Sequence, residues 1–300
     1  MKKLNDLWLK FKKWSEVNLL GYLIVSIVKI IFIFLTFLLL YYILFIIGPF
    51  KDEPNSSVSD STITNNNCNV AGINLHGQLV TYIPLHSEND SSSDFNYDTV
   101  SSENIVEAIK QANDNENIKA IILEINSSGG SPVASEEIAE AVRNSEKPVV
   151  GLIRQTGASG AYWAVSTADK IFASKNSDIG SIGVTSSYLS NVGKNKKDGY
   201  TYEQLSAGKF KDSGSVDKPL TKEEKALFMR DINIIYENFV EAVAQNRNIP
   251  IAKVKSFSDG STFLGEKAKE LGLIDEIGSL PEVESYLQET TGEKPEICWQ

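Results

Sequence analysis

The sequence predicts an α/β fold with a mainly parallel sheet, preceded by one N-terminal transmembrane helix. Short apolar runs typical of buried strands occur at residues 118–125, 148–153 and 170–173, with helical periodicity between them. Because strand and helix alternate in this order, the strands are expected to run parallel with right-handed crossovers. Upstream, residues 30–48 contain no charge and are long enough to cross the hydrocarbon core of a bilayer.

The lysines before this apolar run predict its orientation. By the positive-inside rule the N-terminus is cytoplasmic and everything after Lys51 is extracytoplasmic, as in a single-pass protein of the cell membrane. A cleaved signal peptide fits poorly, because the run is long and no small-residue cleavage site follows it. We divide the chain into a basic cytoplasmic segment (1–18), a transmembrane anchor (19–50), a flexible linker (51–69), a folded domain (70–290) and a C-terminal tail (291–300).

Within the folded domain, periodicity and capping signals predict further elements. Residues 71–82 are expected to form one strand or a hairpin around Gly77. A long amphipathic helix over 220–246 begins with the capping-box pair Thr221 and Glu224. The other expected helices cover 100–113, 132–143, 159–168, 265–271 and 282–287, and a final strand follows Asp275.

Composition excludes several classes of function. The chain holds 39 acidic against 29 basic residues, and the excess of acid lies after residue 50, which argues against a nucleic-acid partner. With two cysteines, two histidines and no CxxC pair, we expect no metal site, and the absence of GxGxxG and GxxxxGK[ST] patterns leaves no sign of a cofactor. Cys68 and Cys298 could form a disulfide outside the cytoplasm or remain two free thiols.

Chemistry is suggested first by Ser159, which lies in the stretch 157–163 between a predicted strand and a helix. This serine could be a nucleophile or a plain helix N-cap, and the residues alone leave both open. Glycines in the loops 126–130 and 157–160 could present N–H groups to an oxyanion or serve only tight turns. Both loops are expected at the carboxyl edge of the sheet, where ligands of open parallel sheets bind.

A nucleophilic serine needs a base. His76 and His86 have no obvious acidic orienter nearby in the sequence, so a Ser-His-Asp triad is disfavoured. A buried lysine with a lowered pKa could accept the proton instead, and Lys209 and Lys211 stand among small and apolar residues. Composition alone does not separate these two from ordinary surface lysines.

Five motifs in order resemble one family. INSSGGS, TGASGAYW, DIGSIGV, SAGKFKDSGS and FLGEKAKELGLID are together similar to the signal peptide peptidase A family of membrane-anchored serine proteases, over residues 70–287. The resemblance implies the caseinolytic-protease/crotonase-like fold, a superhelix of ββα units with a mainly parallel sheet, and makes 70–290 a protease domain. It also implies a Ser/Lys dyad and, as substrates, remnant signal peptides or other unfolded peptides on the extracytoplasmic side.

The resemblance implies a role for each matching residue. Ser159 matches the nucleophile, Lys211 the general base and Ser181 the residue that orients the lysine amine. The oxyanion-hole N–H donors match Gly130 and Gly160. Gly129 is the fallback for the first of these, and Lys209 is the alternative base.

Two positions depart from the family pattern. Ser128 replaces a proline of the first loop, and Ala161 replaces a glycine after the nucleophile, which is tolerated only if its φ is negative. A single motif set resembles the short form of the family, whose members act as homo-oligomeric rings, and the helix over 220–246 is the candidate oligomer surface. The departures motivate an alternative: a catalytically weak or inactive ring-forming membrane scaffold that binds peptides or a partner protease.

Overall fold

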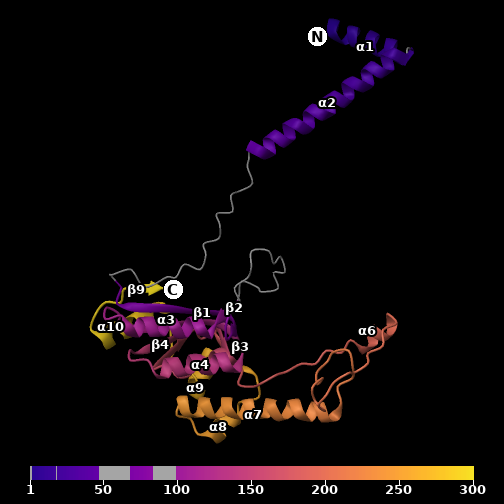
Figure 1. Ribbon diagram of the computed structural model, residues 1–300. Coiled ribbons are helices and arrows are strands. Elements are labelled where there is room, and N and C mark those ends of the chain that lie inside the picture. Colours follow the sequence, from indigo (N-terminus) through magenta and orange to yellow (C-terminus); the bar gives the residue numbers. More distant parts are fainter. Residues whose placement is uncertain (1, 18, 47–67, 84–98) are drawn as a thin grey trace. The chain divides into compact units, whose positions relative to one another are not determined.

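The computed structural model describes residues 2–17, 19–46, 68–83 and 99–300, which form two separate compact units. The first unit, residues 1–60, contains helices α1 (Lys2–Val17) and α2 (Leu19–Ile46). The second unit, residues 61–300, contains the sheet and all other elements (Figure 1). Most of the predicted linker and His86 lie outside the described residues.

No helix in the described part of the chain is both long enough and sufficiently apolar to span a membrane. The structure therefore does not support the predicted transmembrane helix.

The second unit contains a nine-stranded, mainly parallel sheet, as the alternation of strand and helix predicts. Its main path runs β2-β1-β3-β4-β5-β8; β9 pairs with β1, β6 with β4, and the single antiparallel pair joins β6 to β7. The strands are β1 (Val70–Val80), β2 (Thr99–Ser101), β3 (Ala120–Gly130), β4 (Val149–Ala158), β5 (Lys170–Ala173), β6 (Asp178–Gly180), β7 (Thr262–Leu264), β8 (Glu276–Ile277) and β9 (Ile297–Trp299).

The helices of this unit follow the predicted positions closely, and α7 carries the predicted capping box of Thr221 and Glu224. They are α3 (Ser102–Asp114), α4 (Pro132–Arg143), α5 (Gly160–Val165), α6 (Val192–Lys197), α7 (Lys222–Asn246), α8 (Ile251–Lys255), α9 (Gly265–Leu271) and α10 (Leu280–Thr291). The sequence patterns did not predict α6 and α8, whose few residues carry too little periodicity.

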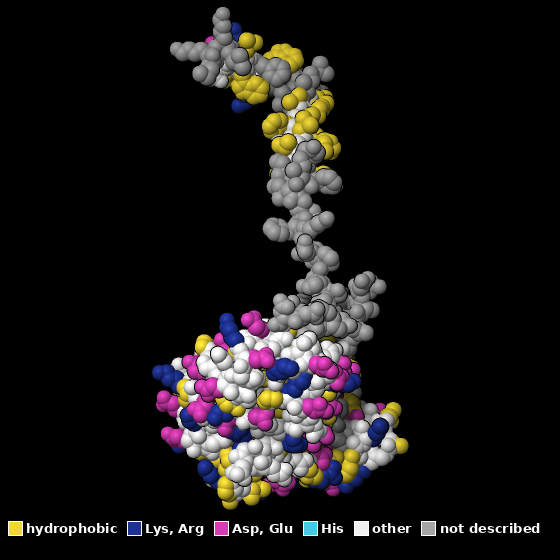
Figure 2. Space-filling model, turned by 90° about the vertical axis from the view of Figure 1, so that its left-hand side faces the viewer, with side chains coloured by type: hydrophobic (Ala, Val, Ile, Leu, Met, Phe, Trp, Pro, Cys, Tyr) yellow, Lys and Arg dark blue, Asp and Glu magenta, His cyan; other side chains and the backbone are white. Residues whose placement is uncertain are grey.

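The apolar strands are buried because helices cover both faces of the sheet. Alternate residues of β3 belong to different cores: Ile121 and Leu123 pack in the cluster that includes α3, α4, α5 and α7, whereas Ile122 packs in the cluster that includes α10. Outside, acidic and basic side chains are intermixed over the face of this unit drawn in Figure 2.

Three strands differ from their predicted extent, and the difference positions the site. β1 is one continuous strand, so the hairpin alternative at Gly77 is wrong. β3 and β4 continue beyond Ile125 and Ile153 to Gly130 and Ala158, where Ser127 pairs with Gly157. The glycine loops that the sequence suggested are therefore the ends of two adjacent paired strands.

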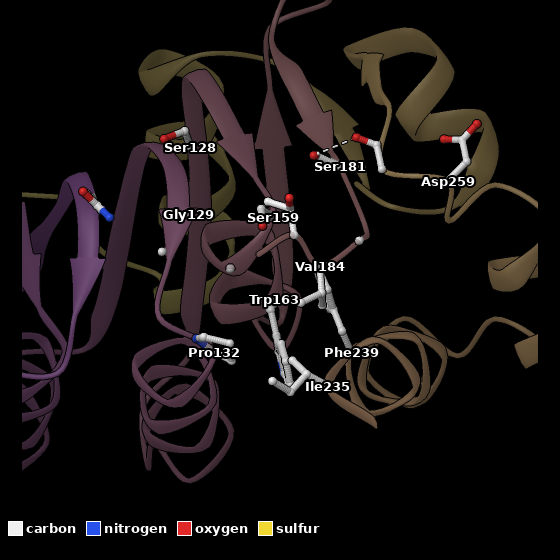
Figure 3. A pocket seen from close by; sticks show the side chains of 16 residues that line it. Ser128, Gly129, Pro132, Ser159, Trp163, Ser181, Val184, Ile235, Phe239 and Asp259 are labelled. Carbon is white, nitrogen blue, oxygen red and sulfur yellow. Dashed lines mark hydrogen bonds between the residues drawn. The ribbon is translucent and has the colours of Figure 1, made fainter. Parts of the chain in front are cut away.

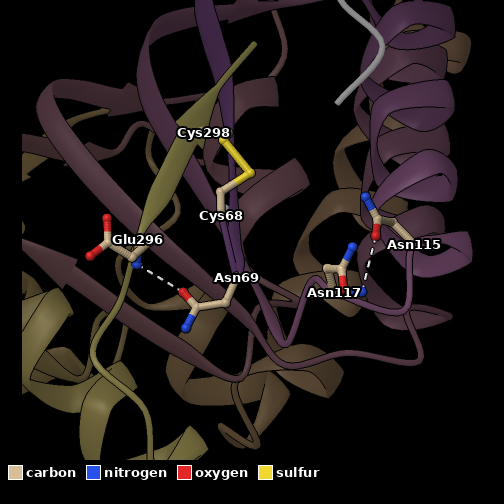
Figure 4. The surroundings of a disulfide bond; sticks show 6 residues. All are labelled: Cys68, Asn69, Asn115, Asn117, Glu296 and Cys298. Atoms are coloured by element: carbon tan, nitrogen blue, oxygen red, sulfur yellow. Dashed lines mark hydrogen bonds between the residues drawn. A yellow bond between two sulfur atoms is a disulfide. The ribbon is translucent and has the colours of Figure 1, made fainter. Parts of the chain in front are cut away.

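The C-terminal residues belong to the sheet as well. β9 pairs parallel with the start of β1, and a disulfide joins Cys68 to Cys298 with their Cα atoms 5.8 Å apart (Figure 4). Asn69 Oδ1 accepts from the Glu296 N–H at 2.8 Å beside it. Of the two alternatives for the cysteines, the structure contains the disulfide, and the predicted tail over 291–300 contains a strand.

Between β6 and α7 a long segment leaves the sheet. We call residues 184–220 the arm; it contains α6, which lies well away from the strands in Figure 1. The arm is fastened near its base, where Tyr188 Oη donates to the Ser215 carbonyl at 3.0 Å and Lys218 Nζ donates to Glu224 of α7 at 2.7 Å.

Candidate active site

Ser159 lies at the turn where β4 ends and α5 begins. Its backbone has φ 52° and ψ −129°, a conformation rare for L residues that costs on the order of 1–3 kcal/mol. Its N–H donates to Gly180 O at 2.7 Å and its carbonyl accepts from Trp163 N at 3.0 Å, so main-chain bonds hold the turn. The side chain makes no capping hydrogen bond to α5. The hydroxyl therefore does not serve as a helix cap and is available for chemistry.

The end of β3 comes into contact with this turn. Gly129 has φ 101°, and a Cβ added there would lie 2.7 Å from Gly160 N and 2.8 Å from Ser159 Cβ. A Cβ added at Gly160 would lie 3.3 Å from Gly130 N. Such close approach of main chains requires glycine, and it puts backbone N–H groups of both loops beside the serine.

The two candidate donors of the first loop differ in their hydrogen bonds. The N–H of Gly129 donates to Ser127 Oγ at 3.1 Å, and Ser127 Oγ in turn donates to the Gly77 carbonyl at 2.5 Å. Gly129 is thus already engaged within its own loop. Of the two glycines, Gly129 is therefore the less available as a donor, and the role of Gly130 stays a prediction from the resemblance.

Ser181 is held near Ser159 by the loop 259–261. It also has a positive φ, 49°, and its N–H donates to Ser261 O at 2.9 Å. Its hydroxyl donates to the Gly260 carbonyl at 2.9 Å (Figure 3). Because that bond uses the hydroxyl proton, the oxygen lone pairs remain able to accept from an amine.

A pocket of about 590 Å³ includes Ser159, Ser181, Gly130 and Gly160 in its lining. Figure 3 shows its apolar wall below Ser159. That wall is formed by Pro132, Trp163, Val184, Ile235 and Phe239. Four of the five predicted site residues thus line one cavity, although they come from three separate parts of the chain.

Asp259 is the charged residue in the lining of this pocket. Hydrogen bonds from the side chain and backbone of Ser261, at 2.6 and 2.9 Å, hold the pKa of its carboxyl below the ordinary value. It is therefore an anion at neutral pH.

The fifth predicted residue, Lys211, lies elsewhere. It is exposed on the arm and does not belong to the lining of this pocket. Lys209 does not belong to it either, since its Nζ pairs with Glu223 Oε2 of α7 at 2.9 Å. Within one copy of the chain, the fold does not bring either lysine into the cavity of Ser159.

The histidine interpretation needs one correction. His76 does have an acidic partner, because its Nε2 lies 3.1 Å from Glu124 Oε1 on the neighbouring strand. Glu124 also accepts from Arg154 at 2.7 Å. The sequence could not show this pair, since its members are far apart along the chain. His76 is nevertheless absent from the lining of the Ser159 pocket, so the pair offers that serine no base.

The structure places both departures from the family pattern beside the pocket or within α5. Ala161 is fully buried within α5 and is not among the described residues with positive φ, which satisfies the condition for alanine there. Ser128 is exposed in the last part of β3 and lines the pocket.

Sequence reasoning missed the apolar wall of the pocket. The indole of Trp163 stacks on Phe239 of α7 with ring centroids 5.0 Å apart and 8° between planes. Ile235 precedes Phe239 by one helical turn and also lines the cavity. The i, i+4 spacing of two apolar residues was visible in the sequence, but nothing local distinguishes a pocket wall from ordinary core.

A model of peptidase family S49 matches residues 141–293. The putative protease MJ0651 of Methanocaldococcus jannaschii is 39% identical over 185 residues, 61% of this chain and 60% of that protein. The putative signal peptide peptidase SppA of Enterococcus faecium is 32% identical over 195 residues, 64% of this chain and 57% of that protein. The alignments thus span about three fifths of each of these curated relatives.

Among solved structures, a mutant ClpP1 from Listeria monocytogenes matches 69% of this chain and 91% of its own, with a TM-score of 0.44 and 14% identity.

Proposed function

This chain belongs to peptidase family S49, the family of the SppA-type peptidases, and from that premise we propose that it is a serine endopeptidase with a Ser/Lys dyad. The observation that carries the proposal is Ser159. It is a serine with strained backbone and no capping hydrogen bond, it lines a pocket, and it lies against Gly129 at the end of a second strand. A buried turn of this kind is costly to maintain for structural reasons alone.

In the proposed reaction the Ser159 hydroxyl attacks a peptide carbonyl while neutral Lys211 takes the hydroxyl proton. The oxyanion accepts hydrogen bonds from the N–H groups of Gly130 and Gly160. Lys211 then gives its proton to the leaving amine as the C–N bond breaks, and water hydrolyses the acyl-enzyme by the same route in reverse. Ser181 accepts from the lysine amine and orients it.

This reaction requires Lys211 to come from outside the pocket's own chain. We therefore include in the proposal a homo-oligomeric ring in which the arm of one copy carries Lys211 to Ser159 of its neighbour. The exposed position of Lys211 on an extended segment supports this arrangement. Head-to-tail contacts of one kind close into rings when the rotation between copies permits.

The proposed substrates are extended, unfolded peptides with an apolar residue near the cut, including remnant signal peptides. The apolar wall of Trp163, Ile235 and Phe239 beside Ser159 supports an apolar side chain in the pocket. The name of the Enterococcus faecium relative, a putative signal peptide peptidase, supports the substrate class.

We further propose that the second unit is extracytoplasmic and that the first unit attaches it to the cell membrane. The Cys68–Cys298 disulfide supports an oxidising compartment. The uncharged run 30–48 in the sequence supports membrane attachment, as does the exposure of apolar side chains such as Phe32 and Phe37 on α2. Release of the protein from membranes by alkaline carbonate alone would contradict this part of the proposal.

A fluorophosphonate probe together with an apolar peptide substrate tests the catalytic proposal on the full chain in detergent. The parent should be labelled and should cleave the peptide, whereas Ser159→Ala should lose both properties. Ser166→Ala is the matched control, since Ser166 is buried in the same region without lining the pocket. Equal cleavage by the parent and Ser159→Ala would sink the assignment.

The alternative, a ring-forming scaffold without activity, is favoured by one observation: the pocket lacks Lys211 within its own chain. A scaffold should bind peptide without reacting with the fluorophosphonate. An unlabelled parent that still assembles and retains peptide would establish this alternative.

A further inference from the structure

A groove of about 970 Å³ lies on the outer surface of α3 and α4, away from the Ser159 pocket. Four exposed glutamates line it. They are Glu103, Glu107, Glu137 and Glu140. The first two are one helical turn apart on α3, and the last two are one turn apart on α4, so the carboxylates form two facing rows.

These carboxylates are weakly compensated. Glu137 accepts a hydrogen bond from Ser102, and Glu107 lies 4.0 Å from Lys110 on the same helix. Among described residues, Glu103 and Glu140 have no basic group within 4 Å. An uncompensated row of like charges on adjacent helices is destabilising in an isolated copy and is relieved by a cationic partner.

The groove also offers apolar contact area. Tyr82, two residues after β1, lines it with 62% of its surface exposed, and Val106 and Ala141 are half-buried and also line it. An exposed aromatic ring flanked by carboxylates fits a partner that carries both lysines and apolar side chains.

The arm of this same chain has that composition. Lys194, Lys196 and Lys197 of α6 are exposed, and in the described structure no carboxylate lies within 4 Å of them. Leu189 and Leu205, on either side of α6, are 81% and 90% exposed. By contrast, Lys209 and Lys218 nearer the base of the arm are paired with glutamates of α7.

We propose that the groove between α3 and α4 is the docking site for α6 of a second copy of this chain. The lysines of α6 would face the glutamate rows, and leucines of the arm would cover the apolar surface beside Tyr82. Because arm and groove are different surfaces, the contact is head-to-tail and can propagate around a ring. This docking contact rests on the proposed function in one respect: it would bring the arm, and with it Lys211, to the neighbouring copy.

Charge-swap variants of the full chain in detergent micelles, followed by sedimentation, test this proposal. Lys194→Glu/Lys196→Glu in the arm and Glu107→Lys/Glu140→Lys in the groove should each weaken assembly on the order of tenfold, because like charges then meet. A chain with all four substitutions should assemble like the parent. A mixture of the two double variants should also recover part of the assembly through arm–groove pairs of restored sign.

Glu136→Lys and Lys253→Glu are the controls. Glu136 neighbours Glu137 on α4 but does not line the groove, and Lys253 is an exposed lysine on α8. Both should leave assembly unchanged, and the melting temperature of every variant shows that it folds. Raising the salt concentration should weaken assembly of the parent and should affect assembly of the two double variants less.

Three results would overturn the proposal. The parent could be monomeric, or the chain with all four substitutions could fail to assemble. Alternatively, the groove variant Glu107→Lys/Glu140→Lys could lose assembly while the arm variant Lys194→Glu/Lys196→Glu assembles like the parent. The last would mean that the groove receives another occupant, such as an external basic protein. Fluorophosphonate labelling and peptide cleavage by the parent decide the catalytic proposal independently, so the two failures are distinguishable.

Discussion

The turn at Ser159 and the arm that carries Lys211 are built in opposite ways. Around Ser159 the neighbouring Ala158, Gly160 and Ala161 are buried, and the turn is bonded to Gly180 O and Trp163 N. On the arm, Lys211 is exposed and its own N–H is bonded only within the local turn, to Gly208 O at 3.1 Å.

This difference shows which half of the proposed dyad is prepared in advance. A strained backbone persists only where the surroundings over-determine it, and the paired ends of β3, β4 and β6 do so at Ser159. No paired strand ends surround Lys211 in this way, since the described strands lie outside residues 184–220. Folding alone thus positions the proposed nucleophile, whereas the proposed base would be positioned only in the proposed ring.

The largest effect is expected at Lys211, and Lys209 on the same arm provides the comparison. Lys211→Met should lower kcat/KM for an apolar peptide on the order of 10³-fold or more, because the general base is lost. Lys209→Met should change it little, since the exposed pair with Glu223 contributes little. Steady-state kinetics with both variants checks this, and the reverse order of effects would move the base to Lys209.

Mixing two inactive variants sharpens the same comparison. Ser159→Ala retains the lysine and Lys211→Met retains the serine. If the arm acts on a neighbouring copy, mixed rings should regain about a quarter of parental activity, the fraction of contacts that join an intact serine to an intact lysine. Mixtures that stay inactive after dissociation and reassembly would show that serine and lysine act within one chain.

Glycine substitutions should separate the two regions by stability and rate. A Cβ at Gly130 would lie 2.2 Å from Leu79 O, so Gly130→Ala must displace the strand end and should lower kcat about 100-fold. On the arm, a Cβ at Gly193 meets no atom within 4 Å, and Gly193→Ala should be neutral or slightly stabilising. Peptide cleavage and thermal melting measure both. Comparable losses in the two variants would remove the contrast between a rigid site and a tolerant arm.

Removing the disulfide measures how much the link between β9 and the start of β1 stabilises the fold. Cys68→Ala/Cys298→Ala should lower the free energy of unfolding by about 5 kcal/mol, because the bond joins residues 230 positions apart and the entropy removed from the unfolded chain grows with loop length. Denaturant titration of the variant, and of the parent with and without reductant, measures the change. The probe should still label Ser159 at low temperature, since β9 lies at the other end of β1 from the site. If the variant is unfolded and is not labelled, the Ser159 pocket depends on the Cys68–Cys298 bond.

The smallest effect is expected at Glu224, where the arm joins α7. The hydrogen bond from Lys218, followed by that from the Thr221 backbone, lowers the pKa of Glu224 from its ordinary value of 4.5 to about 2. A depressed carboxyl pKa stabilises the fold above the ordinary value, and this contribution is lost as the pH falls from 4.5 towards 2. Glu224→Gln should therefore show a shallower loss of melting temperature over that range than the parent. Glu223→Gln, on the exposed side of α7, should follow the parent curve.

Much of the fold could be predicted from the chain because the signals are local. The apolar runs gave the central strands, and Thr221 with Glu224 marked the start of α7 within three residues. Predictions failed where a strand is short or its partner distant. β9 has three residues and exists because it pairs with β1 and is joined to it through Cys298.

The candidate site divides in the same manner. Motif order identified Ser159, Ser181, Gly130 and Gly160, and these four residues share one pocket. The wall formed by Phe239 and the pairing of His76 with Glu124 were not predictable, since each depends on residues far apart in sequence.

From the chain alone, the main strands and helices, the family and the residue types available for catalysis could be predicted, because these depend on neighbours within a few positions, whereas α6, α8 and β9 could not. Tertiary structure alone decided that the ends of β3 and β4 meet at Ser159, that the chain is closed by Cys68 and Cys298, and that Lys211 stays outside the pocket. These outcomes depend on which distant segments pack together, and that choice follows from burial and backbone pairing over the whole unit rather than from any local pattern.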